Sequence, residues 1–462
     1  MSSMIVSYLE KRTKSHSLAI YRFFFGLLMF FSLCRFWSKG WIDSLYIKPD
    51  FHFSYYLFEW VKPIGDWTYV IFIIAIISSL FVCVGYKYRI SIIIFFISFT
   101  YIELMDKTTY LNHYYFISIL SFLLIFLPAG SSFSIDSYLA KKSYNTVPKW
   151  TVDSLKLLIS IVYIYAGLAK LNSDWLLEAM PLKIWLTSRY HFPIVGETLF
   201  QYDWFHYFMS WAGILYDLMI PFLLFYSRTR LFGFILVIIF HLLTKVLFPI
   251  GMFPYIMIVS SIIFFSPKFH FKIIMFIKKF IYNLLFFLNI QKNNIKNSLE
   301  EKDYFFKYHK SVLLIISLFF IIQLIFPFRY LLYPGELFWH EQGYRFSWRV
   351  MLVEKTGFTD FKIVNPANKN NFFYVDNSNF LTPFQEKQMS FQPDLILEFA
   401  HHLGDYYSYI NKDIEVYVDN YVTLNGRKSQ RCVSNTVNLY DEKESFKNKK
   451  WILPLNDEIK GL

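Results

Sequence analysis

About nine apolar runs, each close to the length that crosses a bilayer, dominate this sequence of 462 residues. A membrane-spanning helix needs about 20 mostly apolar residues, or a few fewer where neighbouring helices allow it. The runs lie at residues 18–36, 67–85, 89–104, 112–128, 155–170, 206–226, 231–248, 252–266 and 309–328. We therefore predict an all-α polytopic membrane domain of about nine transmembrane helices.

The composition supports a membrane protein and argues against a nucleic-acid-binding one. Hydrophobic residues make up 55% of the chain and charged residues only 17%, whereas soluble proteins have about 25% charged residues. The net charge is +12, but the basic residues are spread among the apolar runs, as in loops that flank a membrane. The chain is polar as far as about Ser17, and the first apolar run lacks a small-residue cleavage site. This run is therefore predicted to remain in the protein as a span and not to be a cleaved signal peptide.

The basic loops predict the orientation. If the spans alternate, the basic loops all fall on one side, which should be the cytoplasmic side. These loops carry Lys11, Arg12, Lys14, Lys87, Arg89, Lys141, Lys142, Lys149, Arg228, Arg230 and the basic stretch 268–310. The N-terminus is then cytoplasmic and the C-terminal tail extracytoplasmic. The apolar segment Phe271–Ile290 contains Lys272, Lys278 and Lys279, so we predict an amphipathic helix at the membrane surface and not a further span.

The composition becomes polar after about Leu331, which predicts a transmembrane domain over residues 1–330 and a small extracytoplasmic α+β domain over 331–462. Strand-like patterns occupy Trp348–Glu354 and Phe358–Val364, joined through Gly357, and a further one occupies Glu415–Thr423.

Helix and turn signals complete the predicted tail domain. Thr382, Pro383 and Gln385 have the pattern of an N-cap, a first helical residue and a capping box. The helix that begins there is predicted to run toward Tyr409, with a break near Pro393. Asn425-Gly426 is typical of a hairpin turn.

Ionisable residues inside or at the ends of spans are costly enough to suggest function, and three of them stand out. His113 opens the fourth span, Lys170 closes the fifth, and His241 lies in the outer half of the seventh. The predicted orientation brings all three close to the outer leaflet. A lysine removed from water loses the hydration of its ammonium form, so its neutral amine becomes a usable base.

Structural interpretations of the same three residues stay open at this point. Lys170 could extend its amine to the membrane interface, His113 could bond a neighbouring carbonyl at a helix end, and His241 could be a packed core residue. The sequence shows no serine-hydrolase, zinc-protease, Walker or dinucleotide-binding motif. The three cysteines, Cys34, Cys83 and Cys432, form no visible disulfide framework or thiolate metal site. We predict no metal.

Several separate segments resemble motifs of the vitamin K-dependent γ-carboxylases. Asp106–His113 resembles their D-K-T-x-x-x-N-H stretch, and Tyr165–Trp175 resembles A-G-x-x-K-L-x-x-D-W. The matching segments further along are Phe240-His241-Leu242, Ile250–Phe253, Trp339 with Gly343–Met351, Val416–Asp419 and Leu424–Arg427. The resemblance covers nearly the whole chain and is best for bacterial members, which implies a bacterial cell membrane.

The resemblance implies a specific reaction. In this family the motif lysine deprotonates reduced vitamin K, the anion reacts with O₂, and the oxygenated quinone species removes a γ-proton from a peptide glutamate. CO₂ adds to the carbanion and vitamin K epoxide is released. Lys170 is then the catalytic base and His113 a neighbouring catalytic group. The implied pocket-lining residues are Asn112, His241, Trp339, Tyr344, Ser347 and Trp348.

The implied cofactor is the hydroquinone of phylloquinone or menaquinone, with O₂ and CO₂ as co-substrates and no metal. The implied partners are a glutamate-containing peptide or protein and the lipid bilayer. Animal members continue well beyond the stretch that matches Trp451–Leu455, and Arg345 replaces a small residue in their G-Y-x-x-S-W run. Peptide recognition is therefore left open. The alternatives are a quinone epoxidase without carboxylation, or a non-enzymatic lipid-binding or transport protein.

Overall fold

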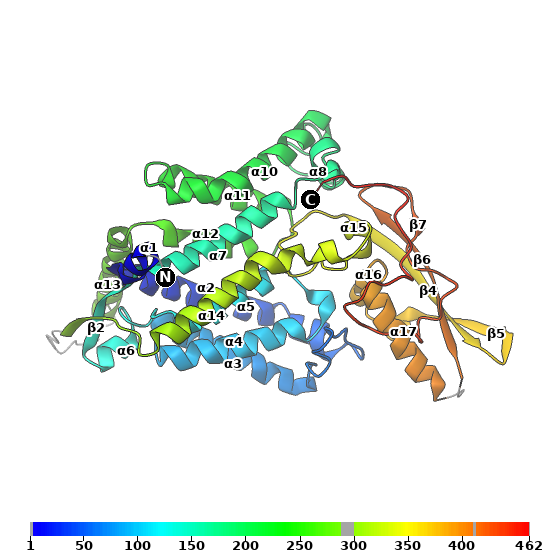
Figure 1. The fold of residues 1–462 in the computed structure, drawn as a ribbon, viewed down its shortest axis with the longest axis horizontal. Helices are drawn as coiled ribbons and strands as arrows, with labels where there is room; N and C mark the ends of the chain where they lie inside the picture. Colours follow the sequence, from blue (N-terminus) through cyan, green and yellow to red (C-terminus); the bar gives the residue numbers. More distant parts are fainter. Residues whose placement is uncertain (1–2, 288–299, 410–412, 462) are drawn as a thin grey trace.

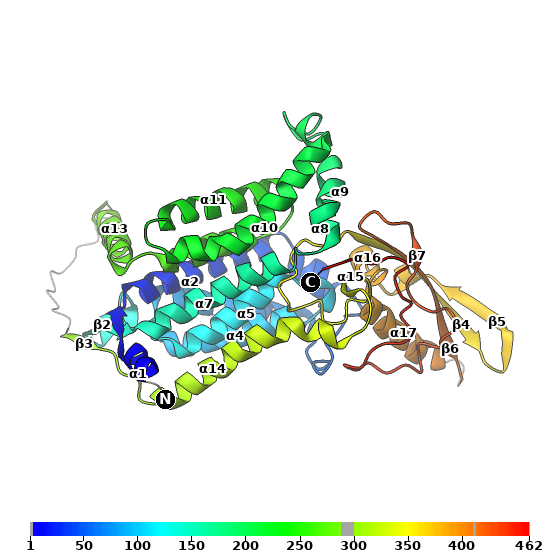
Figure 2. The same ribbon diagram turned by 45° about the horizontal axis from the view of Figure 1, so that its top comes forward.

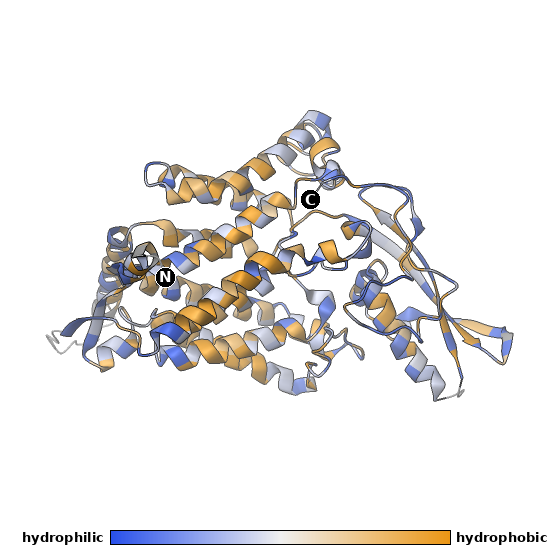
Figure 3. Ribbon diagram, viewed as in Figure 1, coloured by the Kyte–Doolittle hydropathy of each residue, from blue (hydrophilic) through white to orange (hydrophobic). Residues whose placement is uncertain are grey.

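Long apolar helices lie side by side and form the body of the molecule in a computed structural model, which describes residues 3–287, 300–409 and 413–461 (Figure 1). The colouring by hydropathy shows these helices to be mostly hydrophobic along their length (Figure 3). They are α2 (His16–Ser38), α3 (Thr68–Val84), α4 (Tyr88–Leu104), α5 (Asn112–Phe126), α7 (Lys149–Leu168), α10 (Asp203–Phe225), α11 (Arg230–Leu247), α12 (Phe253–Ser261) and α14 (His309–Ile325). Each of them falls on one of the predicted apolar runs.

The number of spans is smaller than predicted when helix length is considered. Among the described residues, six helical stretches are long and apolar enough to cross a membrane, or seven if the bent pair Phe253–Phe264 and Pro267–Leu284 is one span. Two further apolar helices, α4 and α5, have 17 and 15 residues. The polar turn Asp106–Tyr110 lies between them, as it lies between the two predicted runs. The predicted helical membrane domain is confirmed, but its predicted span count is not.

The loops predicted to share one side of the membrane do lie together. Strand β1 (Arg12–Lys14) pairs antiparallel with β2 (Lys142–Pro148), which pairs parallel with β3 (Glu300–Asp303). These strands precede α2, α7 and α14. In addition, the backbone N–H groups of Lys87 and Tyr88 donate to the Asp136 carboxylate at 2.7 and 2.8 Å. We call this end of the bundle the β1–β3 end.

Helix α13 (Pro267–Phe287) leaves the bundle at the β1–β3 end. It is bent by 118° from the preceding helical segment, and the side chains of Lys272, Lys278 and Lys279 are exposed. The predicted amphipathic helix is thus present as a helix, while its position on a membrane surface stays a prediction. Residues 288–290 of the predicted segment lie outside the described residues.

The residues from Lys355 to Gly461, here called the C-terminal domain, lie at the opposite end of the bundle (Figures 1 and 2). Their sheet has the order β5–β4–β6–β7 and is antiparallel throughout. Its strands are β4 (Lys355–Asn365), β5 (Asn368–Val375), β6 (Glu415–Leu424) and β7 (Gln430–Arg431). Helices α16 (Pro383–Met389) and α17 (Pro393–Ser408) share one apolar core with the sheet, in which Phe361, Phe399 and Val416 are fully buried. The expected helical membrane domain followed by an α+β domain is therefore confirmed.

Local signals in the C-terminal domain were mostly accurate. Thr382 caps α16, and its side chain and that of Gln385 form the predicted capping box. The helix breaks before Pro393 as predicted. Asn425 and Gly426 both have positive φ, 48° and 79°, as the predicted hairpin turn requires.

The predicted strand at Trp348–Glu354 is wrong. Trp348 and Met351 have φ values of 61° and 54°, in the left-handed region that an extended strand cannot contain. These residues instead form an irregular segment. Strand β4 begins only at Lys355.

A close contact between α2 and α3 yields a testable prediction. A Cβ atom on Gly26 would lie 2.4 Å from the backbone nitrogen of Cys83 and 2.7 Å from the carbonyl oxygen of Ser79. Gly26→Ala should therefore push the helices apart and cost about 1–3 kcal/mol of stability, seen as a lower midpoint of thermal unfolding in detergent. Gly213→Ala is the matched control because its nearest neighbour, a Trp175 ring carbon, would be 3.6 Å away. Equal unfolding midpoints for both variants would contradict this packing.

Candidate active site

A largely apolar pocket opens near the C-terminal-domain end of the bundle, between α7, α10, α11 and α12. About 760 Å³ of space not filled by protein atoms lies between these helices, and part of it is open to the outside. Its polar lining comes from Tyr163, Lys170, Asp217, His241 and Thr244. The other lining residues are Val162, Ala166, Trp175, Leu182, Met209, Gly213, Phe240, Phe248, Ile250, Phe253, Met257, Val350 and Met351. Such a pocket, apolar with a few polar groups on one side, suits an apolar ligand with a polar ring.

Lys170 projects its amine into this pocket. Helix α7 ends at Leu168, and Lys170 follows in the turn beyond it. Its Nζ lies 2.8 Å from Oδ2 of Asp217 and donates to the carbonyl of Ala166 at 3.0 Å. The ring of Trp175 lies 5.3 Å from the same nitrogen. The side chain is only 7% exposed, so it does not extend to the interface as the structural interpretation required.

Asp217 is a site residue that the sequence interpretation missed. It lies on α10, and its side chain is as buried as that of Lys170, with 7% exposure. A buried carboxylate needs a cationic or hydrogen-bonding partner, and Lys170 supplies one. The signal was present in the sequence, because Asp217 is an ionisable residue inside the predicted span 206–226. The rule that singled out the two histidines applies equally to it.

His241 lines the same pocket from α11. Its Nε2 lies 3.1 Å from the hydroxyl of Tyr163, which in turn is 3.5 Å from the hydroxyl of Tyr216. Among the described residues its Nδ1 has no hydrogen-bond partner, although the atom is buried. Whichever tautomer the imidazole adopts, Nδ1 can therefore donate or accept one hydrogen bond within the site.

His113 lies close to the pocket but does not line it. It begins α5, and the ring of Phe253 lies 6.1 Å from its own ring and 5.8 Å from that of His241. A Cβ placed on Gly251 would be 3.7 Å from the His113 ring. His113 therefore packs against residues 251–253, one of whose side chains, Phe253, forms a wall of the pocket.

The other residues expected to line the pocket have structural contacts elsewhere. Asn112 donates to the carbonyl of Arg349 at 3.0 Å. Trp348 is buried against Tyr115, with ring centres 5.0 Å apart, and Ser347 donates to the carbonyl of Tyr344.

Two more expected residues lie toward the C-terminal domain. Trp339 donates from Nε1 to the carbonyl of Leu453 at 2.8 Å, and Nζ of Lys355 lies 5.8 Å from the centre of its ring. Tyr344 lines a separate polar cavity. Of the site residues expected from the sequence, Lys170 and His241 are the two that line the apolar pocket in the described part of the chain.

The segment from Tyr344 to Met351 nevertheless contributes to the site through its backbone path. Phe346, Trp348 and Met351 all adopt positive φ without being glycine. Such strained residues persist only where their surroundings hold them, often at functional sites. Here the hydroxyl of Tyr110 accepts from the Phe346 N–H at 2.7 Å, and Asn112 holds the carbonyl of residue 349. This path places the side chains of Val350 and Met351 in the pocket wall.

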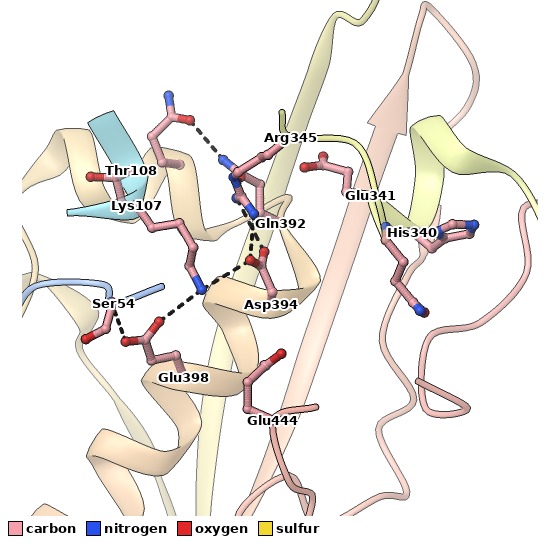
Figure 4. A network of polar contacts seen from close by, with 12 residues as sticks. Ser54, Lys107, Thr108, His340, Glu341, Arg345, Gln392, Asp394, Glu398 and Glu444 are labelled. Atoms are coloured by element: carbon pink, nitrogen blue, oxygen red, sulfur yellow. Dashed lines mark hydrogen bonds and ion pairs between the residues drawn. The ribbon is translucent and has the colours of Figure 1, made fainter. Parts of the chain in front are cut away.

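A partly buried polar network joins the bundle to the C-terminal domain (Figure 4). Lys107 lies 3.1 Å from Asp394 and 3.2 Å from Glu398, and Arg345 lies 2.7 Å from Asp394. Gln392 accepts a further hydrogen bond from Arg345. Burial alone would raise the pKa of Asp394, but Arg345 and Lys107 hold it well below its ordinary value. For Lys107, burial lowers the pKa, while the charges of Asp394 and Glu398 raise it above the ordinary value.

Comparison with known families identifies the chain. The sequence model of the HTTM domain matches residues 10–269, which is more than half of the chain. A second model, described as the lumenal domain of vitamin K-dependent gamma-carboxylase, matches residues 308–458. The chain belongs to the vitamin K-dependent γ-carboxylase family. No solved structure matches it.

Membership of the γ-carboxylase family confirms the resemblance drawn from the motifs and implies a vitamin K cofactor. It also agrees with a multi-pass membrane protein, because the HTTM match spans the helices from α2 to α12. That the chain is a bacterial-type member stays an expectation. Within residues 3–287, 300–409 and 413–461, three or more His, Cys, Asp or Glu side chains are nowhere grouped as a metal site would require.

Proposed function

We propose that this protein is a γ-glutamyl carboxylase that couples the epoxidation of reduced vitamin K by O₂ to the carboxylation of peptide glutamate. The observation that carries this proposal is the buried Lys170–Asp217 pair inside an apolar pocket. When bound, reduced vitamin K would supply, together with O₂, the base that removes a glutamate γ-proton. The chain's own residues have to bind it, orient it and accept its first proton.

The lining of the pocket fits a hydroquinone with an isoprenoid tail. Aromatic and aliphatic side chains surround most of the space. Moving a flat apolar ring from water into such surroundings is favourable. The polar atoms lie just after α7 and on α7, α10 and α11. A ring hydroxyl there would find both an amine and Nδ1 of His241, which has no partner among the described residues. A ligand hydroxyl is the kind of partner that a buried imidazole nitrogen requires.

The contact between Lys170 and Asp217 provides a route to the neutral amine. The ammonium can pass a proton from Nζ to Oδ2 of Asp217 across 2.8 Å. The resulting amine and carboxylic acid are neutral. The ion pair is also neutral overall, so the proton transfer puts no net charge into the apolar pocket. The neutral Nζ then accepts the proton of a ring hydroxyl, while the carbonyl of Ala166 keeps the nitrogen in place. In this scheme Lys170 is the catalytic base and Asp217 is a positioning residue.

The peptide substrate is proposed to approach from the C-terminal domain, on the extracytoplasmic side. A second cavity, of about 920 Å³, is polar and contains Tyr344 in its lining. Its cationic side chains are Lys107, Arg345, Lys355 and Lys387, against the acids Glu341 and Glu354. Lys107 and Arg345 pair with Asp394 and Glu398, and Lys355 pairs with Glu341. The charges therefore nearly balance, and it is the polar, hydrogen-bonding lining that favours a peptide over an apolar ligand. His113 is proposed to support the chemistry indirectly, by packing against residues 251–253.

The proposal is tested by supplying membranes that contain the protein with reduced vitamin K, labelled CO₂ and a glutamate-rich peptide. We expect epoxide and labelled peptide to form together, and both to require Lys170. Epoxide without labelled peptide would leave a quinone epoxidase. If neither product forms with phylloquinone-derived or menaquinone-derived hydroquinone, the enzymatic proposal fails and a lipid-binding or transport role remains.

Asp217→Asn should slow epoxidation without unfolding the protein. The change removes the proton acceptor and a charged hydrogen bond to Lys170, and such bonds contribute about 1.5–3 kcal/mol. That range corresponds to a loss of roughly 10–100-fold in kcat, measured as epoxide formed per enzyme at saturating quinone. Asp203→Asn, on the same helix but exposed, is the matched control and should keep the wild-type rate. An Asp217→Asn enzyme with wild-type kcat would exclude the proton route through this carboxylate.

A further inference from the structure

A third cavity lies at the β1–β3 end, far along the bundle from the apolar pocket. It is a groove between α7, α14 and the turn that joins α10 to α11, with about 1330 Å³ of space not filled by protein atoms. The helices that border it are visible around the middle of Figure 1 and in Figure 2. The lining residues are Tyr8, Lys149, Trp150, Asp153, Ser154, Lys156, Leu157, Phe225, Arg230, Leu313, Ile316, Ser317 and Phe320.

The polar part of the groove carries more positive than negative charge. Lys149 and Lys156 lie 3.8 and 3.5 Å from the same carboxylate, that of Asp153. Arg230, the third cation, donates hydrogen bonds to two backbone carbonyls. Asp153 is the one acidic residue among the described residues that line the groove. Three cations thus face one carboxylate. The charges of Lys149 and Arg230 both act unfavourably on the Lys156 ammonium, and a bound anion would relieve that repulsion.

The remaining walls of the groove are apolar and belong to helices that cross the membrane. Leu313, Ile316 and Phe320 follow one another along α14, and Leu157 and Phe225 are 42% and 49% exposed. Lys156 lies two turns into α7, or about 10 Å along the helix from Lys149. The cations therefore sit where lipid head groups would meet acyl chains. Trp150 and Tyr8 are of the residue types that favour this interfacial depth.

We propose that this groove binds one anionic phospholipid of the leaflet at the β1–β3 end. Its phosphate would lie among Lys149, Lys156 and Arg230, and its acyl chains would cover the apolar side chains of α14 and α7. Free phosphate offers the same anionic group, but it would leave those apolar walls uncovered. Basic pockets between membrane helices bind anionic head groups in this way. The site is separate from the Lys170 pocket, so the inference does not depend on the proposed reaction.

The test compares two double variants of the full-length protein purified in mild detergent. Lys149→Met/Lys156→Met removes two cations of the groove and keeps side chains of similar length. Lys307→Met/Lys310→Met removes two exposed lysines at the same end, outside the groove. Phosphatidylglycerol bound per protein is measured by native mass spectrometry. We expect its affinity to fall at least about tenfold in the first variant, and to stay close to wild type in the second.

Thermal unfolding separates lipid binding from a folding defect. A ligand that binds the folded state raises the unfolding midpoint, so phosphatidylglycerol should stabilise the wild type and the Lys307/Lys310 variant, and phosphatidylcholine should not. The Lys149/Lys156 variant should unfold at the wild-type midpoint without lipid and gain nothing from phosphatidylglycerol. Equal lipid retention by both variants would overturn the proposal, as would equal loss. Stabilisation by inorganic phosphate alone, matching that by lipid, would overturn the phospholipid as the occupant.

Discussion

Lys170→Arg should abolish quinone epoxidation and glutamate carboxylation together while leaving the protein folded. Arginine keeps a positive charge that can pair with Asp217 in place of the Lys170 ammonium. A guanidinium is not deprotonated in proteins, so it cannot become the neutral base that the reaction needs. General-base catalysis contributes roughly 10²–10⁴-fold, and the rate of epoxide formation should fall by that factor. Both products should fall in parallel, because the carboxylation uses the base that epoxidation generates.

The control is Lys245→Arg, a similar change in the last turn of α11, near the same end of the bundle. It should retain the wild-type rates, and both arginine variants should unfold near the wild-type midpoint. A Lys170→Arg enzyme that keeps more than about a tenth of the wild-type epoxidation rate would exclude Lys170 as the base, given that range. Loss of carboxylation alone, with normal epoxidation, would instead indicate a role in peptide handling.

The sequence located this lysine but not its partner, for a physical reason. A lysine at the end of an apolar run is conspicuous, and the surrounding motif resembles a known one. Its partner Asp217 is 47 positions further along the chain, and only the packing of α7 against α10 brings the two together. Arg22 is a similar case. It lies inside the first predicted span, and its guanidinium donates to the carbonyls of Val82, Cys83 and Ala129.

Motif membership predicted importance better than it predicted location. Asn112 and Trp348 belong to segments that match the family, yet neither residue lines the pocket. Their contacts instead hold the backbone of residues 344–351 in place. A motif records that a residue is required, whereas the path of the chain decides what it touches. The left-handed residues Phe346 and Met351 determine that path, and no hydrophobic pattern signals a positive φ at a non-glycine residue.

The helices were easier to predict than their number as spans. Apolar periodicity, the helix cap at Thr382 and the turn at Asn425-Gly426 depend on neighbouring residues, so they are readable in the sequence. Where a helix stops inside an apolar run depends on tertiary contacts. Helix α12 is an example, because it ends at Ser261 inside the predicted run 252–266, and the helical segment it begins is bent by 118° from α13.

Asp394→Asn should cost about 2 kcal/mol of folding free energy at neutral pH, within the range for hydrogen bonds to charged groups, because this ion pair is only partly buried. The carboxylate serves both Lys107 and Arg345 at 3.1 and 2.7 Å. Asparagine leaves these two cations with less compensation, although Glu398 still lies 3.2 Å from Lys107. Thermal unfolding in detergent, followed by tryptophan fluorescence, should show a clearly lower midpoint. Asp405→Asn is the control, since this exposed residue of the same helix makes one surface hydrogen bond, to Tyr440.

Acid should remove the difference between wild type and Asp394→Asn. The pKa of Asp394 is held below the ordinary aspartate value of 3.8 in the folded protein, so the unfolded chain binds its proton first as the pH falls. The stabilisation is therefore complete well above pH 3.8 and is lost progressively below it. The gap between the two unfolding midpoints should be constant from about pH 7 to 5 and narrow below about pH 4. A gap that stays the same down to pH 3, or one equally large for Asp405→Asn, would show that the carboxylate charge does not hold the C-terminal domain on the bundle.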